Sequence, residues 1–175
     1  FNPDDYPQIQ TVGENATQIK ISAETLADGI ANTVYASSDE DNRPVMNSIY
    51  FDIKPDCTTM VASDLQKLIC YTADDVNAPA ESSFILNKRH ANVLKGLLGK
   101  ESGEIDVNYD EKIAVFSFGN ITMISCLVVG KYPDYRTIIP KNNSNILRIN
   151  RMQLLNTVRR IAVCTPTASN HIRFD

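Results

Sequence analysis

The sequence predicts an α+β domain in which two helices pack against mainly antiparallel β-sheets. Apolar residues recur at helical spacing within residues 22–36 and 87–98. About six to eight short runs rich in β-branched and aromatic residues occupy much of the remaining chain, which is typical of strands. Most links between these runs are short enough for hairpins, and hairpins join antiparallel neighbours. At 175 residues and 43% hydrophobic content, the chain can bury the core of one domain and part of another.

Each predicted helix has a residue that can cap its N-terminus. Ser22 precedes the first helix, which we expect to end near residue 36. Asn87 precedes the second helix, and Gly99 follows that helix as a C-cap. The apolar stripe of the first helix consists of Leu26, Ile30 and Val34.

The predicted strands follow the helices closely. We expect them at residues 45–53, 58–62, 68–72, 82–86, 104–108, 113–118 and 121–129. Gly119 and Asn120 form a short hairpin connection between the last two. Residues 1–20 contain scattered prolines and polar groups, and they predict an extended lead-in or linker.

An internal repeat divides the chain. At one constant offset Ile21 matches Ile149, Leu26 matches Leu154 and Ile30 matches Val158, with Asn150 as the cap of a third helix. After a slightly shorter loop, residues 47–52 match residues 170–175. The first copy continues well beyond residue 52, whereas the second copy ends with the sequence. We therefore expect the chain to be part of a longer one.

Charge is distributed unevenly along the sequence. Residues 1–126 contain 9 basic and 19 acidic residues, whereas residues 127–175 contain 8 basic and 2 acidic residues. Acidic turns alone would serve solubility. The alternative is a mostly acidic molecule with a basic surface reserved for a polyanion. Basic residues on the predicted helices fit contacts to phosphates without base readout, although ordinary solvated faces would look the same.

Few residues in the sequence suggest catalysis or metal binding. No glycine-rich phosphate loop or nucleophile elbow is present, and the two histidines lack metal-ligand spacing. Ser63 and Asp64 could belong to a hydrolytic site, but no nearby histidine or lysine partner is evident. No apolar run is long enough to span a membrane. The four separated cysteines predict buried free thiols in a reducing cytosol, so we expect a cytoplasmic protein without a cofactor.

Several motifs occur in an order that resembles the bacterial sliding clamp, the beta subunit of DNA polymerase III. R-P-V-M-N-S-I at residues 43–49 resembles a strand that opens a clamp domain, and V-A-S-D at 61–64 resembles the family's V-A-[ST]-D turn. The hairpin at 119–125 fits the family pattern. G-K-Y-P-D-Y-R-T-I-I-P-K at 130–141 is the most specific motif, and D-Y-P at 5–7 resembles the exit from the first clamp domain.

The resemblance implies the DNA clamp fold and a domain division. Residues 1–18 would be the tail of the first clamp domain, 19–140 the complete middle domain and 141–175 an incomplete third domain. The parent protein would be a non-catalytic homodimeric ring around duplex DNA that gives the replicative polymerase processivity, while this chain alone would be monomeric. Its partners would include the polymerase, the clamp loader and other clamp-binding peptides. The alternative is a cytosolic peptide- or protein-binding module without a DNA role.

The resemblance also implies two sets of site residues. This chain's share of a peptide groove between the second and third domains would be Met46, Ser63, Leu65, Gln66, Lys67, Leu68, Pro133, Thr137 and Ile138. The DNA-facing residues would be Arg43, Lys88, Arg89, Arg151 and Arg159. The family usually continues its V-A-[ST]-D turn with Gly-His-Arg-Leu, whereas this chain has Leu-Gln-Lys-Leu. Leucine in place of glycine is expected to narrow or reshape the groove floor.

Overall fold

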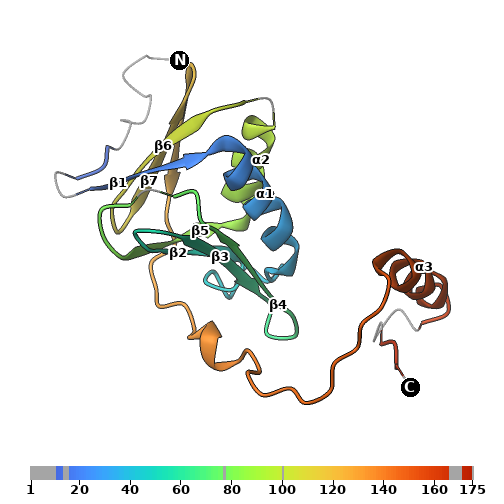
Figure 1. Ribbon diagram of the computed structural model, residues 1–175. Coiled ribbons are helices and arrows are strands. Elements are labelled where there is room, and N and C mark those ends of the chain that lie inside the picture. Colours follow the sequence, from blue (N-terminus) through green and yellow to red (C-terminus); the bar gives the residue numbers. More distant parts are fainter. Residues whose placement is uncertain (1–10, 14–15, 77, 100, 166–170, 175) are drawn as a thin grey trace, which may run out of the picture. The chain divides into compact units, whose positions relative to one another are not determined.

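The computed structural model describes residues 11–13, 16–76, 78–99, 101–165 and 171–174. The chain falls into two compact units, Phe1–Tyr135 and Arg136–Asp175. In the described residues, the first unit contains two four-stranded sheets and two α-helices, and the second contains one α-helix (Figure 1). Within the described residues, no helix is long and apolar enough to cross a membrane.

Sheet 1 consists of four antiparallel strands in the order β1-β6-β7-β8. The strands are β1 (Thr17–Ser22), β6 (Glu104–Tyr109), β7 (Ile113–Phe118) and β8 (Ile121–Cys126). A two-residue turn joins β7 to β8, and Gly119 adopts a positive φ of 52° there, which glycine accommodates readily. The Asp110 carboxylate orders the β6–β7 turn by accepting hydrogen bonds from the backbone of Lys112 and Ile113.

Sheet 2 has the strand order β4-β3-β2-β5, again antiparallel throughout. The strands are β2 (Ser48–Ile53), β3 (Thr58–Ser63), β4 (Leu68–Ala73) and β5 (Ser82–Asn87). Alternate residues along these strands face opposite sides of the sheet, and apolar residues occupy both sides. Sheet 2 is therefore packed on two faces.

The two helices of the first unit lie side by side along one flank of the sheets (Figure 1). Helix α1 (Ala23–Thr33) begins where Ser22 Oγ accepts a hydrogen bond from the Thr25 backbone, and it continues into the 3₁₀ turn η2 (Val34–Ala36). Helix α2 (Lys88–Leu98) begins at Asn87, whose side chain accepts from the Arg89 backbone, and ends at the C-cap Gly99. The predicted caps of both helices are confirmed.

The main core lies between the inner faces of the two sheets and the two helices. Phe51 of β2 stacks on Phe84 of β5 with ring centroids 4.5 Å apart, and Phe116 of β7 is fully buried in the same cluster. Helix α1 contributes Leu26 and Ile30 to this cluster. The alternating patterns of the sequence thus correspond to one continuous core, and the predicted α+β class is confirmed.

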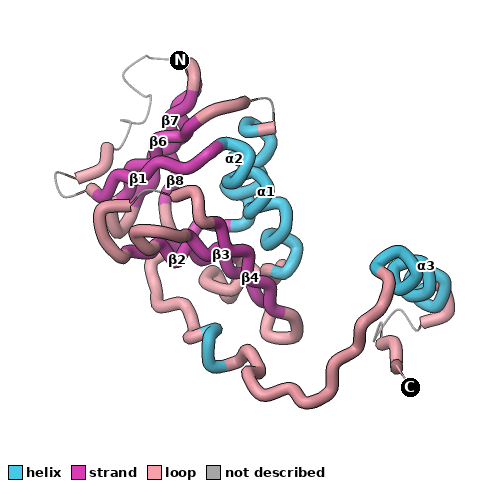
Figure 2. The backbone as a smooth tube through the Cα atoms, viewed as in Figure 1, coloured by secondary structure: helices cyan, strands magenta, loops and turns pink. Residues whose placement is uncertain are grey.

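The second unit contains the other half of the repeat. Helix α3 (Arg151–Ala162) is the α-helix of this unit (Figure 2). It begins at Asn150, whose side chain accepts from the backbones of Met152 and Gln153, and none of its residues is buried. The 3₁₀ turn η3 (Tyr135–Thr137) spans the boundary between the units. The helical part of the repeat is therefore present. Residues 171–174 have no regular secondary structure, and positions 170 and 175 of the predicted matching strand lie outside the described residues. The D-Y-P motif at 5–7 also lies outside the described residues.

Four sequence expectations were wrong. Residues 17–20 belong to β1 and pair with β6, so the lead-in does not extend to residue 20. Residues 45–47 were expected in a strand but form a turn, in which the Met46 and Asn47 backbones donate to Arg43 O. The strand expected to reach residue 129 ends at Cys126, because the Val128 backbone donates to Ile85 O of the other sheet. The cysteines were expected to be buried, but only Cys57 is half-buried. The free thiols of Cys70, Cys126 and Cys164 are exposed. Strand alternation places Cys70 and Cys126 on outward positions, and Cys164 lies in the turn that follows α3.

Candidate functional site

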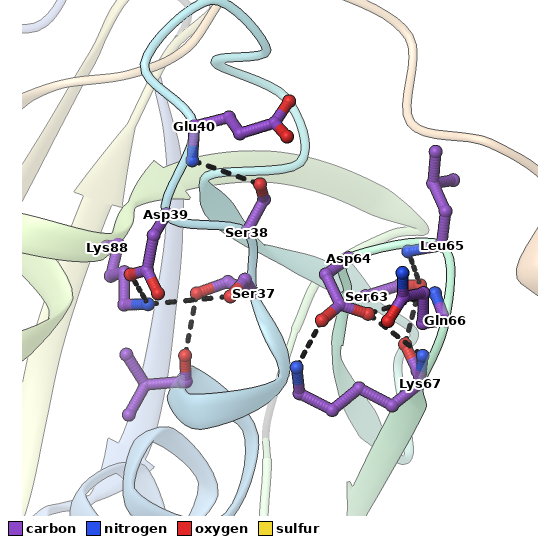
Figure 3. Close-up of polar contacts among 11 residues, drawn as sticks. Ser37, Ser38, Asp39, Glu40, Ser63, Asp64, Leu65, Gln66, Lys67 and Lys88 are labelled. Atoms are coloured by element: carbon purple, nitrogen blue, oxygen red, sulfur yellow. Dashed lines mark hydrogen bonds and ion pairs between the residues drawn. The ribbon is translucent and has the colours of Figure 1, made fainter. Parts of the chain in front are cut away.

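The turn between β3 and β4 is braced by the side chains of Ser63 and Asp64. Ser63 Oγ accepts a hydrogen bond from the Leu65 backbone at 3.0 Å and donates one to Lys67 O at 2.8 Å. Asp64 Oδ1 accepts from the backbones of Gln66 and Lys67 at 3.0 and 2.9 Å (Figure 3). Because these bonds satisfy the turn's backbone locally, its shape is fixed before any ligand arrives. The Ser63 hydroxyl thus serves the turn.

The Asp64 carboxylate also forms an ion pair with the Lys67 ammonium (Figure 3). Partial burial alone would raise the pKa of Asp64. The hydrogen bonds from the Lys67 side chain and from the two backbone N–H groups outweigh that effect and lower the pKa to about 2. The turn therefore keeps its negative anchor over the whole neutral pH range.

Leu65 is held in a conformation that leucine rarely adopts. Its φ is 76°, and it is the sole non-glycine residue with positive φ in the described part of the chain. Its side chain is 65% exposed and points away from the polar contacts of the turn (Figure 3). Within the described residues the Leu65 side chain therefore projects into solvent, and its expected effect on the shape of the groove floor stays a prediction.

A second apolar cluster covers the outer face of sheet 2. This outer-face cluster consists of the buried residues Met46, Val61, Ile85, Tyr132 and Tyr135. Val45, Tyr50, Leu68 and Val128 pack against it and are half-buried. The turn bearing Leu65 thus adjoins a packed apolar surface through Leu68, the residue that starts β4.

The segment after β8 closes the outer-face cluster with two tyrosines. The Tyr132 ring stacks on Tyr50 with centroids 4.8 Å apart and planes within 6° of parallel. The Tyr135 hydroxyl donates to Asp52 Oδ2 at 2.7 Å, and its ring meets Tyr50 edge-on. Burial raises the pKa of Tyr132 to about 12. Pro133, between the two tyrosines, is exposed.

An open cleft of about 430 Å³ runs beside this cluster. Tyr50, Ile85, Val128 and Tyr132 form its apolar wall. Asp110, Glu111 and Lys131 also line it. The mixture of an apolar wall and a few charged groups is typical of surfaces that accept side chains of another molecule.

The structure brings together most of the predicted peptide-binding residues. Met46, at 7% exposure, is a core residue of the outer-face cluster, and Leu68 is half-buried against it. Ser63, Leu65, Gln66 and Lys67 form the adjoining turn. Thr137 and Ile138 belong to the second unit, where both are exposed, so their place beside the turn stays a prediction.

Sequence reasoning identified Met46 but missed the other four buried residues of the outer-face cluster. Val61 and Ile85 lie in strands whose neighbours on either side are also buried, so strict alternation gave no sign of two covered faces. Tyr132 and Tyr135 lie within the specific motif at 130–141, and their aromatic character was the available signal.

The predicted DNA-facing residues differ in whether their side chains form ion pairs within the protein. Lys88 Nζ contacts Asp39 Oδ1 at 2.6 Å, and this bond lowers the pKa of Asp39 (Figure 3). Arg43 pairs with Glu40 at 3.4 Å. Arg89 on α2 is exposed and makes no ion pair within the described residues. Arg151 and Arg159, both exposed, lie on α3 of the second unit.

Helix α1 brings acidic charge to the same flank. Its exposed residues include Glu24 and Asp28, and it carries no basic residue. Helix α2 supplies Lys88, Arg89 and Lys95, of which Lys88 is already paired. The helix pair therefore carries only a weak positive charge, so it attracts phosphates only weakly.

Two sheets, two flanking helices and a braced turn beside an outer apolar cluster define a clamp-type domain. Residues 20–134 match the family model of the DNA polymerase III beta subunit, central domain. The chain belongs to this family. It is 25% identical to the beta sliding clamp of Halalkalibacterium halodurans, covering 98% of this chain and 46% of that protein. It is 24% identical to the beta sliding clamp of Synechococcus elongatus, in a match that covers 99% of this chain and 47% of that protein.

Solved structures agree with this assignment. A sliding clamp (DNA polymerase III subunit beta) from Bartonella birtlesii, bound to griselimycin, superimposes with a TM-score of 0.84 at 25% identity. That match covers 96% of this chain and 46% of the Bartonella chain. A putative DNA polymerase III beta subunit from Eubacterium rectale superimposes with a TM-score of 0.87 at 21% identity. That match covers 95% of this chain and 45% of the Eubacterium chain. The chain thus spans slightly less than half the length of the relatives it matches.

Proposed function

We propose that this chain is the central part of a DNA sliding clamp. The full-length protein encircles duplex DNA as a homodimeric ring and holds the replicative polymerase on its template without catalysing a reaction itself. The observation that carries this proposal is the match to the beta-subunit central domain over residues 20–134, together with the clamp-type fold. In this proposal residues 1–18 belong to the first clamp domain, 19–140 to the second and 141–175 to the third.

The charge on the helical flank supports a sliding role. A ring that moves along DNA needs phosphate contacts that are individually weak and independent of base sequence. Arg89 on α2 makes no ion pair within the described residues, and Lys88 and Arg43 are already attracted to carboxylates. We assign Arg43, Lys88, Arg89, Arg151 and Arg159 to the surface that meets the DNA backbone. Encirclement, rather than affinity, then keeps the protein on its template.

The outer surface of sheet 2 supports a second role, the binding of partner peptides. The turn from Ser63 to Leu68 and the half-buried Leu68 present apolar atoms on a rigid support, with Met46 beneath them. Thr137, Ile138 and the remainder of the third domain complete the groove in the full-length protein. The Bartonella relative binds griselimycin, which is consistent with a ligand-binding surface in this family. The replicative polymerase and the clamp loader are the expected partners.

Retention on circular DNA tests the sliding function. The full-length protein is loaded by its clamp loader onto nicked circular duplex, separated from free protein, and the DNA is then cut once. A sliding ring stays on the circle and leaves the linear molecule within minutes. Equal retention on both forms would indicate ordinary DNA binding, and absence from both would favour a peptide-binding module without a DNA role.

Peptide binding is tested with an array of overlapping peptides that covers the replicative polymerase of the same bacterium. The full-length protein should bind at least one peptide, and Leu68→Ala should weaken this binding by about 1–3 kcal/mol, as expected for an apolar anchor. Ile124→Ala is the matched control, because Ile124 is a half-exposed aliphatic residue on β8 of the other sheet. An equal loss in both variants would place the groove elsewhere.

A further inference from the structure

We propose that Asp39 and Glu40 are positioning residues that weaken the contact between the DNA-facing surface and duplex phosphates. Each carboxylate holds one cation of that surface, Lys88 or Arg43, in an ion pair. The inference rests on the proposed function, which places both cations against the DNA backbone. It goes beyond that function because it identifies carboxylates of the chain itself that compete with the phosphates.

Both carboxylates lie on one loop, residues 37–42, which we call the acidic loop. The Ser38 backbone N–H donates to Met46 O at 2.9 Å and closes the loop at its base. The Glu40 backbone N–H donates to Ser38 Oγ at 3.1 Å (Figure 3). The Arg43 backbone N–H donates to Glu40 O at 3.2 Å. Because these bonds hold the backbone of the loop, its carboxylates lie beside the cations before DNA arrives.

Lys88, the first residue of α2, is the more firmly held cation. Its Nζ atom lies 2.6 Å from Asp39 Oδ1 and donates to Ser37 O at 3.4 Å (Figure 3). Its side chain is only 21% exposed, whereas that of Asp39 is 93% exposed. The hydrogen bond from Lys88 lowers the pKa of Asp39, so this carboxylate is charged at neutral pH. Two oxygen atoms of the acidic loop thus occupy donors of the ammonium, and a phosphate must displace them or share the cation.

Arg43 is paired more loosely. Its Nε atom lies 3.4 Å from Glu40 Oε2, and both side chains are more than half exposed. Exposed ion pairs are weak, so DNA phosphates can displace the carboxylates, and the acidic loop reduces binding without abolishing it. Affinity for duplex and its dependence on salt both grow with the number of phosphates that cations neutralise. A cation that already has a carboxylate partner gains less from a phosphate, so the acidic loop lowers both quantities.

The test measures the affinity of the full-length protein for a short fluorescent linear duplex by anisotropy at several salt concentrations. Asp39→Asn combined with Glu40→Gln removes both charges and keeps the shape of each side chain. We expect this loop variant to bind about three- to ten-fold more tightly than the parent, because two weak competing ion pairs are lost. The logarithm of its affinity should also fall more steeply with the logarithm of the salt concentration, by up to about 2 in slope. A purely structural role of the two carboxylates would leave this slope unchanged.

Two controls separate the ion pairs from the overall charge. Glu24→Gln combined with Asp28→Asn removes the same charge from exposed positions of α1 that form no ion pair within the described residues. This α1 variant should gain less than about two-fold in affinity, since it changes only the general field. Lys88→Gln combined with Arg43→Gln, added to the loop variant, should remove the gain, because the two released cations are then absent.

The outcomes separate this inference from the proposed function. If the protein is retained on circular duplex but the loop variant gains no more than the α1 variant, the role of the acidic loop is wrong and the sliding function stands. If the gain survives the loss of Lys88 and Arg43, other cations produce it, and the role of the ion pairs is refuted. If the protein is not retained on the circle and no variant binds duplex at low salt, both the sliding function and this inference are wrong. Asp39→Asn alone should show part of the gain at an unchanged melting temperature, and this single variant decides the question if the loop variant is less stable than the parent.

Discussion

Replacing Tyr135 with phenylalanine should loosen the segment that leaves the first unit. The Tyr135 hydroxyl donates to Asp52 Oδ2 at 2.7 Å, joining residues 83 positions apart in the sequence. Tyr135 is only 8% exposed and belongs to the outer-face cluster. Tyr135→Phe keeps this apolar contact and removes only the hydroxyl, so the change isolates the hydrogen bond.

The expected loss follows from the nature of the acceptor. A hydrogen bond to a charged group contributes about 1.5–3 kcal/mol when it is shielded from water, and the partial exposure of Asp52 places this one near the lower limit. A loss of about 1.5 kcal/mol in a chain of this size corresponds to a fall in Tm of roughly 3–6 °C. Urea unfolding of the whole chain, followed by circular dichroism, measures the free energy directly.

Tyr35→Phe is the matched control. Tyr35 is 60% exposed, so the same chemical change there should alter the free energy of unfolding by less than about 0.5 kcal/mol. If Tyr135→Phe were as stable as the parent, the hydroxyl would not anchor the exit segment to sheet 2. The rigid support proposed for the peptide surface would then not depend on this hydrogen bond.

Three further substitutions probe packing and charge. A Cβ atom at Gly29 would lie 2.3 Å from Met60 Sδ in the packed core, so Gly29→Ala should lower the free energy of unfolding by about 1–2 kcal/mol. A Cβ atom at Gly96 meets open space, so Gly96→Ala should raise the free energy of unfolding by up to about 1 kcal/mol. Thermal unfolding of both variants measures these changes. The pKa of Asp64 is lowered to about 2, so its contribution to stability is complete above its unfolded pKa near 3.8 and is lost as the pH falls towards 2. Asp64→Asn should therefore flatten this part of the stability–pH curve, and an unchanged curve would exclude the ionised carboxylate as the brace.

Local signals in the sequence were sufficient for the helices and most strands. Ser22, Asn87 and Asn150 cap helices because their side chains bind backbone groups two or three residues away, and such short-range chemistry is readable directly. The strand β1 was missed because it is stabilised by pairing with β6, more than 80 residues further along the chain. Its alternating Ile19 and Ile21 carry a weaker signal than the prolines that precede it.

The candidate site depends on contacts that no local pattern encodes. The resemblance identified the turn from Ser63 to Leu68, but it did not predict that Leu65 projects outward with a positive φ. The burial of Met46 follows from Tyr132 and Tyr135 returning to cover sheet 2, which is a long-range event. The relation of Thr137 and Ile138 to this turn remains a prediction.

Electron microscopy of the full-length protein that contains this chain tests the central proposal most directly. A sliding clamp should appear as a closed ring with an open centre, made of two copies whose helices line the hole. Class averages of pure protein, recorded without DNA, are sufficient for this comparison. We expect ring-shaped particles with a hole wide enough for duplex DNA. Compact particles without a hole, at concentrations where the dimer persists, would contradict the clamp assignment.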